Sequence, residues 1–243
     1  MVERDGGVAV LRLNRTDKHN AFNRELASVF QSALEALEDD AAVVCVVLTG
    51  AGSAFCAGAD MQEAVAQIAD NGRSDGMGAS IGRAATFSKP LVACVNGPAY
   101  GGGALLAAVC DIRIAAAGAR FRFPGAAYGL VVGGSQLPRI VGAAYAKELM
   151  FTGRVVDAEE ALRMGLVNAV EPPERAFEAT MEMARMIAAN SLEALVATKQ
   201  VVDRALDYRE AARLEADANA RLRQSPEHHA RFRAAADRVA RRE

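Results

Sequence analysis

The sequence is poor in the residues that build disulfide scaffolds and metal sites. Its four cysteines, Cys45, Cys56, Cys94 and Cys110, form no Cys-x-x-Cys pair and stand far apart in a chain of 243 residues. Most of them lie in apolar runs, where a reduced cysteine behaves as a small hydrophobic residue. The pattern therefore argues against a disulfide framework and offers no zinc site.

Histidine is scarce as well, with only His19 and the adjacent pair His228 and His229. Adjacent histidines in a charged helical segment are expected to face solvent, so we predict no metal site there. Cys56 would need a neighbouring base or a helix N-terminus to act as a nucleophile. Because none of the histidines stands near its motif, covalent catalysis through Cys56 is disfavoured.

The chain also lacks long hydrophobic runs and an excess of charge of either sign. No apolar stretch reaches about 18 residues without a charge or a run of glycines, so we expect no transmembrane helix. The 28 lysines and arginines nearly balance the 30 acidic residues. No overall basic field therefore exists to attract nucleic acid or an anionic membrane. The segment from Met1 to Gly7 is short and charged, unlike a signal peptide, and we expect a cytoplasmic protein.

Hydrophobic residues make up 51% of the chain, enough to bury a sizeable core in one large domain. Alternation predicts a strand at Val8–Leu13, and the apolar runs Val43–Thr49 and Leu91–Val95 predict buried strands. The apolar spacing in Arg24–Asp39 is typical of a helix. Strands that alternate with helices indicate an α/β domain with parallel pairing. Further expected elements are a buried helix at Gly103–Val109, short strands at Ile112–Ala115, Arg120–Phe123 and Val167–Val170, a mostly helical chain from Ala143, and a loop at Asn71–Ala79.

Two glycine-containing loops follow the predicted buried strands. The first reads Phe-Cys-Ala-Gly-Ala-Asp over residues 55–60, and the second reads Asn-Gly-Pro-Ala-Tyr-Gly-Gly-Gly over residues 96–103. Small residues let the backbone approach a ligand, and free N–H groups there can bind an anion or a polarised carbonyl oxygen. Tight turns with close helix packing would give the same pattern. Neither loop has the glycine register of a dinucleotide site or the Gly-Lys-Ser/Thr ending of a P-loop.

These loops belong to a series of motifs that resembles the enoyl-CoA hydratase/isomerase, or crotonase, family. Residues 13–15 and 20–22 resemble its L-N-R-P-x-x-x-N-A-L/F opening, with Thr16 where proline is common. The two loops match its F-x-A-G-A-D and N-G-x-A-x-G-G-G motifs, and Cys110-Asp111 matches its C-D. Residues 152–153 and 165–167 resemble its later T-G and G-L-V. Each motif is weak alone, but their order and spacing over nearly the whole chain make a strong resemblance.

The resemblance implies an α/β fold, a crotonase-like spiral of ββα units with a helical C-terminal trimerisation region. Residues 1–190 would form the acyl-CoA-binding core, and residues 191–243 a C-terminal helical region of the same domain. The protein would assemble into a homotrimer or homohexamer. The apolar residues expected to face the core or a neighbouring subunit in this tail are Leu195, Val202, Leu206, Leu214, Leu222 and Phe232.

The resemblance also implies a site for an acyl-CoA thioester, with coenzyme A as part of the substrate or ligand and no separate cofactor. The backbone N–H groups of Ala59 and Gly102 would hold the thioester carbonyl oxygen and stabilise an enolate or oxyanion. Asp60 is expected to fix its loop by hydrogen bonds and not to act as a catalytic acid. The residues implied to receive coenzyme A are Arg15, Lys18, Ala21, Phe22, Ala57, Gly58, Asp60 and Met61. Arg15 and Lys18 are candidate phosphate partners, although arginines and lysines on a surface are more often simply solvated.

The family's pattern breaks at the two positions where its hydratases carry catalytic glutamates. One is Leu105, shortly after the triple glycine, and the other is Gly125, directly after Pro124. From Gly76 to Lys147 the only carboxylate is Asp111. Neither leucine nor glycine can move a proton, so the machinery of efficient hydration is missing. The remaining polar candidates near the acyl group are Tyr100, Arg122, Tyr128 and Gln136, with Glu63, Asp70 and Asp75 from the segment after the first loop.

Two functions are consistent with this sequence. The first is a lyase or isomerase in fatty-acyl or related acyl-CoA metabolism, which stabilises an enolate and uses an unassigned proton donor. The alternative is a non-catalytic acyl-CoA-binding or accessory protein that keeps the pocket without the acids. The apolar residues Leu105, Leu106, Leu130, Val131 and Val132 hint at a hydrophobic acyl tunnel, and core packing explains them equally well.

Overall fold

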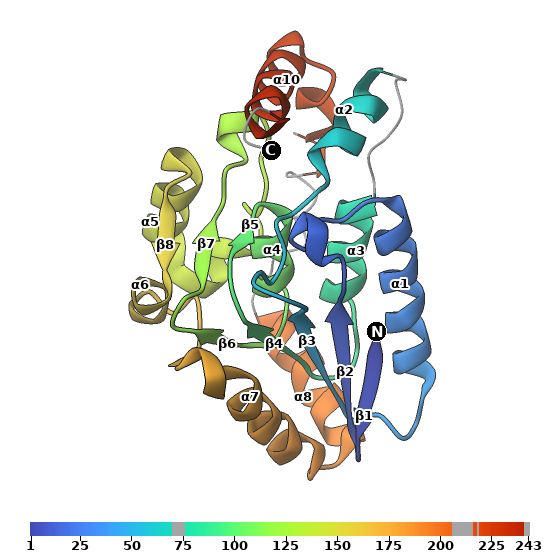
Figure 1. The fold of residues 1–243 in the computed structure, drawn as a ribbon. Coiled ribbons are helices and arrows are strands. Elements are labelled where there is room, and N and C mark those ends of the chain that lie inside the picture. The colour runs from blue at the N-terminus through green and yellow to red at the C-terminus, as the bar shows by residue number, and fades with distance from the viewer. Residues whose placement is uncertain (70–75, 206–215, 218, 241–243) are drawn as a thin grey trace.

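The computed structural model describes residues 1–69, 76–205, 216–217 and 219–240 (Figure 1). Its larger sheet has the strand order β1-β2-β3-β4-β6-β9, in which only the β1–β2 pair is antiparallel. These strands are β1 (Val2–Asp5), β2 (Val8–Leu13), β3 (Cys45–Gly50), β4 (Leu91–Val95), β6 (Ile112–Ala116) and β9 (Ala169–Glu171). A smaller sheet contains β5 (Ala99–Tyr100), β7 (Arg120–Arg122) and β8 (Val155–Asp157). The predicted α/β domain with parallel pairing is confirmed.

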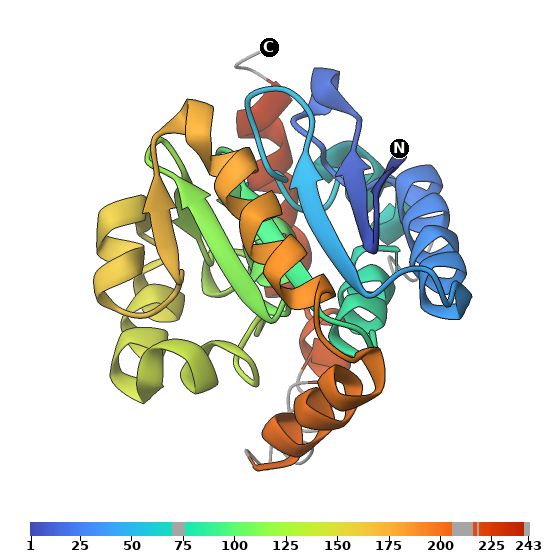
Figure 2. The same ribbon diagram turned by 90° about the horizontal axis from the view of Figure 1, so that it is seen from below.

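Helices cover both faces of the larger sheet. The helices are α1 (Arg24–Asp39), α2 (Met61–Ala69), α3 (Gly76–Ala85), α4 (Gly102–Ala108), α5 (Leu137–Thr152), α6 (Ala158–Arg163), α7 (Pro173–Ala188), α8 (Leu192–Ala205) and α10 (Pro226–Ala240), with short 3₁₀ turns η1 (Thr16–Lys18) and η2 (Ala126–Tyr128). Helix α7 (orange in Figure 2) crosses the sheet, where Met181 and Ala184 pack against Val8, Val47 and Val92. Residues that alternate with these along the strands face the other side and join the core beneath α1, α3 and α4.

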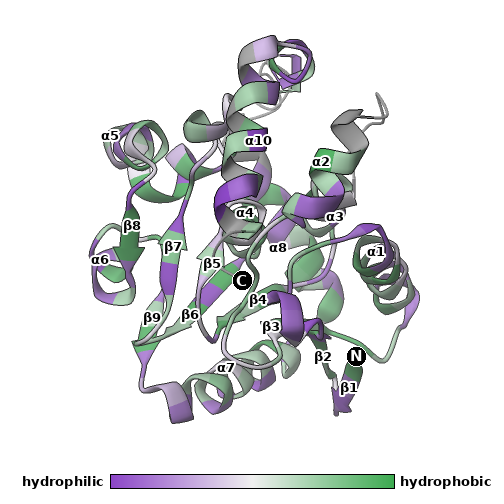
Figure 3. Ribbon diagram, turned by 45° about the horizontal axis from the view of Figure 1, so that its top comes forward, coloured by the Kyte–Doolittle hydropathy of each residue, from purple (hydrophilic) through white to green (hydrophobic). Residues whose placement is uncertain are grey.

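Burial on both faces explains why the central strands read as continuous apolar runs. Every residue of β3 and of β4 is buried. Figure 3 shows the hydrophobic colour concentrated in these central strands and the hydrophilic colour on the outer helices. Within the described residues, no helix combines the length and apolar character needed to cross a membrane.

The predicted elements agree best where the local signal is strong. Helix α1 begins and ends at the predicted residues, because Asn23 accepts a hydrogen bond from the Leu26 N–H at 2.9 Å and the apolar face is regular. Strands β2 and β4 also match, whereas β3 begins two residues later than the apolar run that predicted it. The loop prediction at 71–79 is wrong for residues 76–79, which begin α3. Residues 70–75 lie outside the described residues.

Helix α10 at the C-terminal end packs against α2 and η2 of the same chain (Figure 1). His228 is only 4% exposed, so the expectation that it faces solvent is wrong. Its ring nitrogen Nδ1 lies 2.7 Å from the Tyr128 carbonyl oxygen, and a neutral ring can donate its proton there. Phe232 is buried beside Tyr128, as expected, while Val202 is exposed. Leu206 and Leu214 lie outside the described residues.

The loops that follow β3 and β4 lie at the same edge of the sheet and pack backbone against backbone. Asn96 accepts a hydrogen bond from the Gly50 N–H at 3.1 Å and donates one to the Gly52 carbonyl oxygen at 3.0 Å. A short parallel bridge joins Cys56 to Ala99. The two loops therefore form one rigid unit.

Glycine is required where these loops touch. A Cβ atom added to Gly103 would lie 2.0 Å from the Cys56 carbonyl oxygen, and one added to Gly97 would lie 2.1 Å from the Ser53 carbonyl oxygen. Gly101 has φ +54°, a conformation that other residues rarely adopt. These glycines let the loops approach each other, which supports the close-packing interpretation of the glycine motif.

We expect Gly103→Ala to lower the free energy of unfolding by about 3 kcal/mol or more, because backbone atoms block the added methyl group. Gly82→Ala is the matched control, since Gly82 lies within α3 and nothing lies within 4 Å of an added Cβ. That control should raise stability by up to about 1 kcal/mol. Urea unfolding followed by circular dichroism measures both values, and equal stability of the two variants would contradict the close packing.

Candidate functional site

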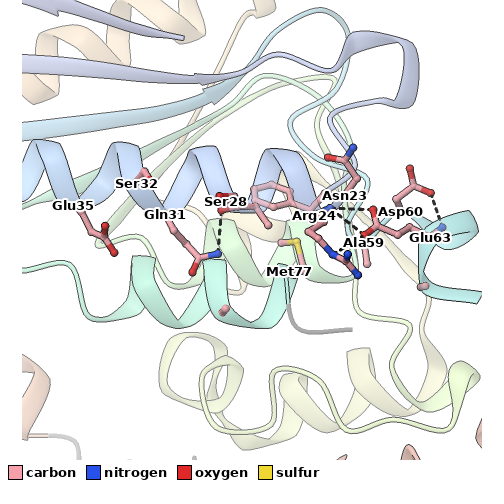
Figure 4. Close-up of a pocket in the computed structure, with 15 residues that line it drawn as sticks. Asn23, Arg24, Ser28, Gln31, Ser32, Glu35, Ala59, Asp60, Glu63 and Met77 are labelled. Carbon is pink, nitrogen blue, oxygen red and sulfur yellow. Dashed lines mark hydrogen bonds and ion pairs between the residues drawn. The ribbon is translucent and has the colours of Figure 1, made fainter. Parts of the chain in front are cut away.

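A cavity of about 460 Å³ lies beside the first glycine loop, between α1, α2 and α3 (Figure 4). The residues that line it are Phe22, Asn23, Arg24, Ala27, Ser28, Gln31, Ser32 and Glu35 from the α1 side, Ala59, Asp60, Glu63 and Ala64 from the loop and α2, and Gly76, Met77 and Ala79 from α3. The apolar residues expected to form an acyl tunnel, from Leu105 to Val132, are not part of this lining. The cavity lies next to the second glycine loop, because Met77, which lines it, also contacts Gly102 of that loop.

The backbone of Ala59 is fixed by its neighbours on either side. The Phe22 N–H donates to the Gly58 carbonyl oxygen at 2.7 Å, and the Asp60 N–H donates to the Phe22 carbonyl oxygen at 2.9 Å. This short parallel bridge leaves the Ala59 N–H outside the pairing. Within the described part of the chain, it donates to no other protein group.

Gly102 begins α4, where the first N–H groups of a helix have no partner inside the helix. Its N–H also donates to no other group among the described residues. A Cβ atom added to Gly58 would lie 3.2 Å from the Gly102 nitrogen, so the two loops bring Gly102 close to the residue that precedes Ala59. The structure thus brings together the two amides that the sequence paired.

The side chain of Met77 lies against Gly102. A Cβ atom on Gly102 would meet the Met77 Cγ at 2.6 Å and its sulfur at 3.2 Å. Met77 also lines the cavity, so this flexible side chain separates the second glycine loop from the space beside α1. No local pattern in the sequence indicates this contact.

Asp60 and Arg15 connect the first loop to the segment after β2. Arg15 Nη1 lies 2.6 Å from Asp60 Oδ2 and also donates to the Ala21 carbonyl oxygen at 3.1 Å. Asp60 Oδ1 accepts hydrogen bonds from the backbone N–H groups of Gln62 and Glu63 at the start of α2. Burial acts to raise the pKa of Asp60, but the bonds from Arg15 and the two amides outweigh it and hold the pKa below its usual value. Asp60 is therefore an ionised loop anchor and a poor proton donor, as expected.

Asn20 is a buried anchor whose role sequence reasoning did not identify. It adopts φ 59°, a left-handed conformation that asparagine tolerates better than most residues. Its Oδ1 accepts from the Arg15 N–H at 2.9 Å, and its Nδ2 donates to the carbonyl oxygens of Ala51 and Ala54. These bonds hold the segment that contains Phe22 against the loop after β3. The Asn-Ala-Phe motif was the only signal that could have indicated it.

The residues predicted to receive coenzyme A gather around this anchor. Ala21 and Phe22 are buried, and the Phe22 ring packs edge-on against Phe30 at 5.4 Å between ring centres. Both side chains are thus largely covered, although Phe22 also lines the cavity. Ala57 is exposed, and Lys18 and Met61 are half-buried.

Leu105 and Gly125, where the resemblance to hydratases led us to expect glutamates, lie in apolar surroundings. Leu105 is 7% exposed within α4. Gly125 has φ −50° and ψ −50°, an ordinary helical conformation that any residue can adopt. The constraint at Gly125 is space, since an added Cβ would lie 3.0 Å from the Leu130 carbonyl oxygen and 3.2 Å from Val132.

The other polar candidates do not supply an evident acid. Asp111 accepts from the Leu91 N–H at 2.8 Å and pairs with Lys199 at 2.8 Å. Arg122 donates to the Gly153 carbonyl oxygen at 2.6 Å, and Tyr128 packs against Phe232. Tyr100 is half-buried and Gln136 precedes α5. Glu63 lines the cavity and accepts a hydrogen bond from the Arg24 N–H at 3.0 Å, while Asp70 and Asp75 lie outside the described residues.

The structure also gives little support to Cys56 as a nucleophile or to a metal site among the described residues. Cys56 is fully buried, and burial raises the pKa of its thiol to about 12. Its sulfur lies 3.3 Å from the Asn20 carbonyl oxygen, to which it can donate a hydrogen bond. The described residues contain no group of three or more histidine, cysteine or acidic side chains that could hold a metal ion.

Comparison with known proteins places the chain in a family. Residues 3–242 match the family model described as enoyl-CoA hydratase/isomerase. The chain is 39% identical over 212 residues to a short-chain-enoyl-CoA hydratase of Clostridium acetobutylicum, and the alignment covers 85% of this chain and 81% of that protein. It is 37% identical over 226 residues to a crotonyl-CoA hydratase of Syntrophomonas wolfei, covering 90% of this chain and 87% of that protein.

Solved structures agree with the sequence relatives. An enoyl-CoA hydratase/isomerase from Pseudoalteromonas atlantica superimposes with a TM-score of 0.88 at 29% identity, covering 98% of this chain and 96% of that chain. A monofunctional enoyl-CoA isomerase from M. smegmatis gives a TM-score of 0.75 at 32% identity, covering 94% of this chain and 96% of that chain. The crotonase fold implied by the sequence motifs is confirmed, and the chain belongs to the enoyl-CoA hydratase/isomerase family.

Proposed function

We propose that this protein binds an acyl-CoA thioester and stabilises its enolate or oxyanion between the N–H groups of Ala59 and Gly102. The observation that supports this most directly is a pair of amides that donate to no other group among the described residues and lie on two interlocked loops beside a cavity. Preorganised donors of this kind contribute about 3–4 kcal/mol each to the stabilisation of developing negative charge. Family membership provides the substrate class, because the matched relatives are named for enoyl-CoA substrates.

Coenzyme A in this proposal is part of the substrate and not a separate cofactor. Its nucleotide end is received by the backbone around Ala21 and Phe22 and by the loop from Ala57 to Met61. Lys18 and Arg15 are the candidate phosphate contacts, and Arg15 also uses Nη1 to hold Ala21 and Asp60. Gly58 and Asp60 act by shaping the loop.

The class of reaction is indicated by the relatives of this chain. Relatives of this chain include both hydratases and an isomerase, so family membership supports a lyase or isomerase acting on acyl-CoA. General acid–base catalysis needs a group that exchanges protons beside the acyl chain, and Leu105 and Gly125 are unable to do so. The same vacancy favours a second candidate, a non-catalytic acyl-CoA-binding or accessory protein. Turnover of a panel of acyl-CoA thioesters followed by mass spectrometry, together with binding by calorimetry, separates the two.

We further propose a cytoplasmic homotrimer or homohexamer. Exposed apolar side chains on α5, β8 and α6 offer a surface for a neighbouring subunit, and Phe151 is 76% exposed there. Light scattering at micromolar concentration should give the mass of a trimer or hexamer. A monomer under these conditions would contradict the assembly.

The Ala59 donor can be tested with Ala59→Pro, which removes the backbone N–H. We expect the folded variant to lose turnover by about 10²–10³-fold, or acyl-CoA affinity if the parent is not an enzyme. Ala59→Gly keeps the N–H and serves as the control that should resemble the parent. Circular dichroism checks that each variant is folded. A folded proline variant with the parent's binding and turnover would show that Ala59 is not a donor.

The missing acids predict that the parent hydrates crotonyl-CoA barely above the uncatalysed rate, because a well-placed acid or base contributes about 10²–10⁴-fold. Restoring both groups as Leu105→Glu with Gly125→Glu should raise the rate of hydration. The backbone at Gly125 permits the change, although the added side chain must displace Leu130 or Val132 slightly. A spectrophotometric assay of crotonyl-CoA gives the rates. Rapid hydration by the unmodified protein would show that another residue replaces the glutamates.

A further inference from the structure

The part of the cavity farthest from Ala59 has an unusually polar wall. Ser28, Gln31, Ser32 and Glu35 line it from α1, and their spacing places them on one face of the helix. Figure 4 shows the side chains of Gln31 and Glu35 directed toward α3. The apolar residues of α1 face the core on its other side. A groove with this composition differs from the hydrophobic tunnel that a simple alkyl chain requires.

The described part of the opposite wall, α3, offers a hydrogen-bond partner to Gln31, through Ser80, and to none of the other three polar side chains. Helix α3 presents Gly76 and Ala79 to the cavity, and neither has a side chain that could hydrogen-bond across it. Among the residues that the structure describes, the side chains of Ser28, Ser32 and Glu35 have no hydrogen-bond or ion-pair partner within the protein. All three are exposed to solvent, so a ligand in the groove would replace water as the partner of these hydroxyl and carboxylate groups.

Gln31 is held in place by its own contacts. Its Nε2 donates to the Ala27 carbonyl oxygen at 3.0 Å and lies 3.4 Å from Ser80 Oγ. The amide oxygen of Gln31 is thereby left as an additional acceptor. Together with the Glu35 carboxylate, this gives the groove an excess of hydrogen-bond acceptors over donors.

The charges of the cavity indicate which end of the ligand enters the groove. Asp60 pairs with Arg15 at 2.6 Å, and Glu63 lies 3.9 Å from Arg24, so both carboxylates have a cationic neighbour. Glu35 has no ion-pair partner among the described residues, so its carboxylate adds a negative charge to this end of the groove. Coenzyme A phosphates would be repelled there, whereas the acyl end of the thioester carries no such charge.

We infer that the groove receives the distal part of the acyl group, and that this part carries a hydrogen-bond donor, a hydroxyl or ammonium group, which Glu35 accepts. The inference rests on the proposed position of the thioester at Ala59 and Gly102. An alkyl chain in the groove would remove Ser28, Ser32 and Glu35 from water without replacing their hydrogen bonds, which is unfavourable. A donor at the end of the acyl chain satisfies the carboxylate and makes the groove selective.

The test compares the affinity of the parent for hexanoyl-CoA, ω-hydroxyhexanoyl-CoA, ω-aminohexanoyl-CoA and adipoyl-CoA by calorimetry, with the butanoyl and octanoyl series to cover chain length. We expect the hydroxyl or the ammonium compound to bind about ten-fold more tightly than the methyl-terminated one, and the carboxylate to bind most weakly. Glu35→Gln should remove the preference for the ammonium group by a similar factor, and it should tighten hexanoyl-CoA binding slightly, because an amide costs less to remove from water than a carboxylate. Glu25→Gln, on the same helix but outside the cavity, is the matched control and should change nothing.

The binding of free coenzyme A to the parent and to Glu35→Gln is measured in the same way. If the methyl-terminated compounds bind as tightly as the donor-bearing ones and Glu35→Gln has no effect, the inferred acyl class is wrong while the thioester site stands. If Glu35→Gln tightens the binding of free coenzyme A, the groove holds the nucleotide end and the inference is overturned. If no acyl-CoA binds, both the proposed function and this inference are overturned.

Discussion

The contact between the loops after β3 and β4 is the constraint on which the rest of the site depends. Their backbones meet so closely that a single methyl group on Gly97 or Gly103 would overlap a carbonyl oxygen of the other loop. This contact holds the start of α4 close to Gly58, which precedes Ala59. Asn96 and the Cys56–Ala99 bridge join the loops, and neither uses the N–H groups of Ala59 and Gly102, which donate to no other group among the described residues.

A second set of interactions fixes the first loop from the side of the cavity. Asn20, Arg15 and Asp60 connect the segment after β2 to the loop after β3 and to the beginning of α2. All three form hydrogen bonds with backbone groups, so their effect is to position main chain and not to present reactive side chains. Preorganisation of this kind is what a backbone donor requires, because a mobile amide would lose much of its advantage when charge develops.

In the proposed function, the paired amides hold the thioester, and the positions of the family's catalytic glutamates are occupied by Leu105 and Gly125. The surroundings of Leu105 and Gly125 are apolar and closely packed, and a carboxylate placed there would be costly unless it were protonated or paired. The cavity instead presents polar groups on α1, at the end of the cavity farthest from Ala59. The proposed function and the inferred acyl specificity therefore depend on different parts of the structure, the paired backbone amides and the polar face of α1.

The sequence by itself determined the elements with strong local signals and the order of the motifs. Helix α1, strands β2 and β4, and the two glycine loops follow from periodicity, capping and small residues that act within a few positions. Tertiary structure alone decided that Gly76 to Ala79 are helical. Gly76 lies so close to Ala27 of α1 that an added Cβ would be 3.0 Å from its methyl carbon, and the packing of α3 on α1 overrides a weak helix propensity. It also buried His228 against Tyr128 and brought Met77 to Gly102. These contacts join segments that are distant in sequence, and local residue patterns do not record which distant segments will meet.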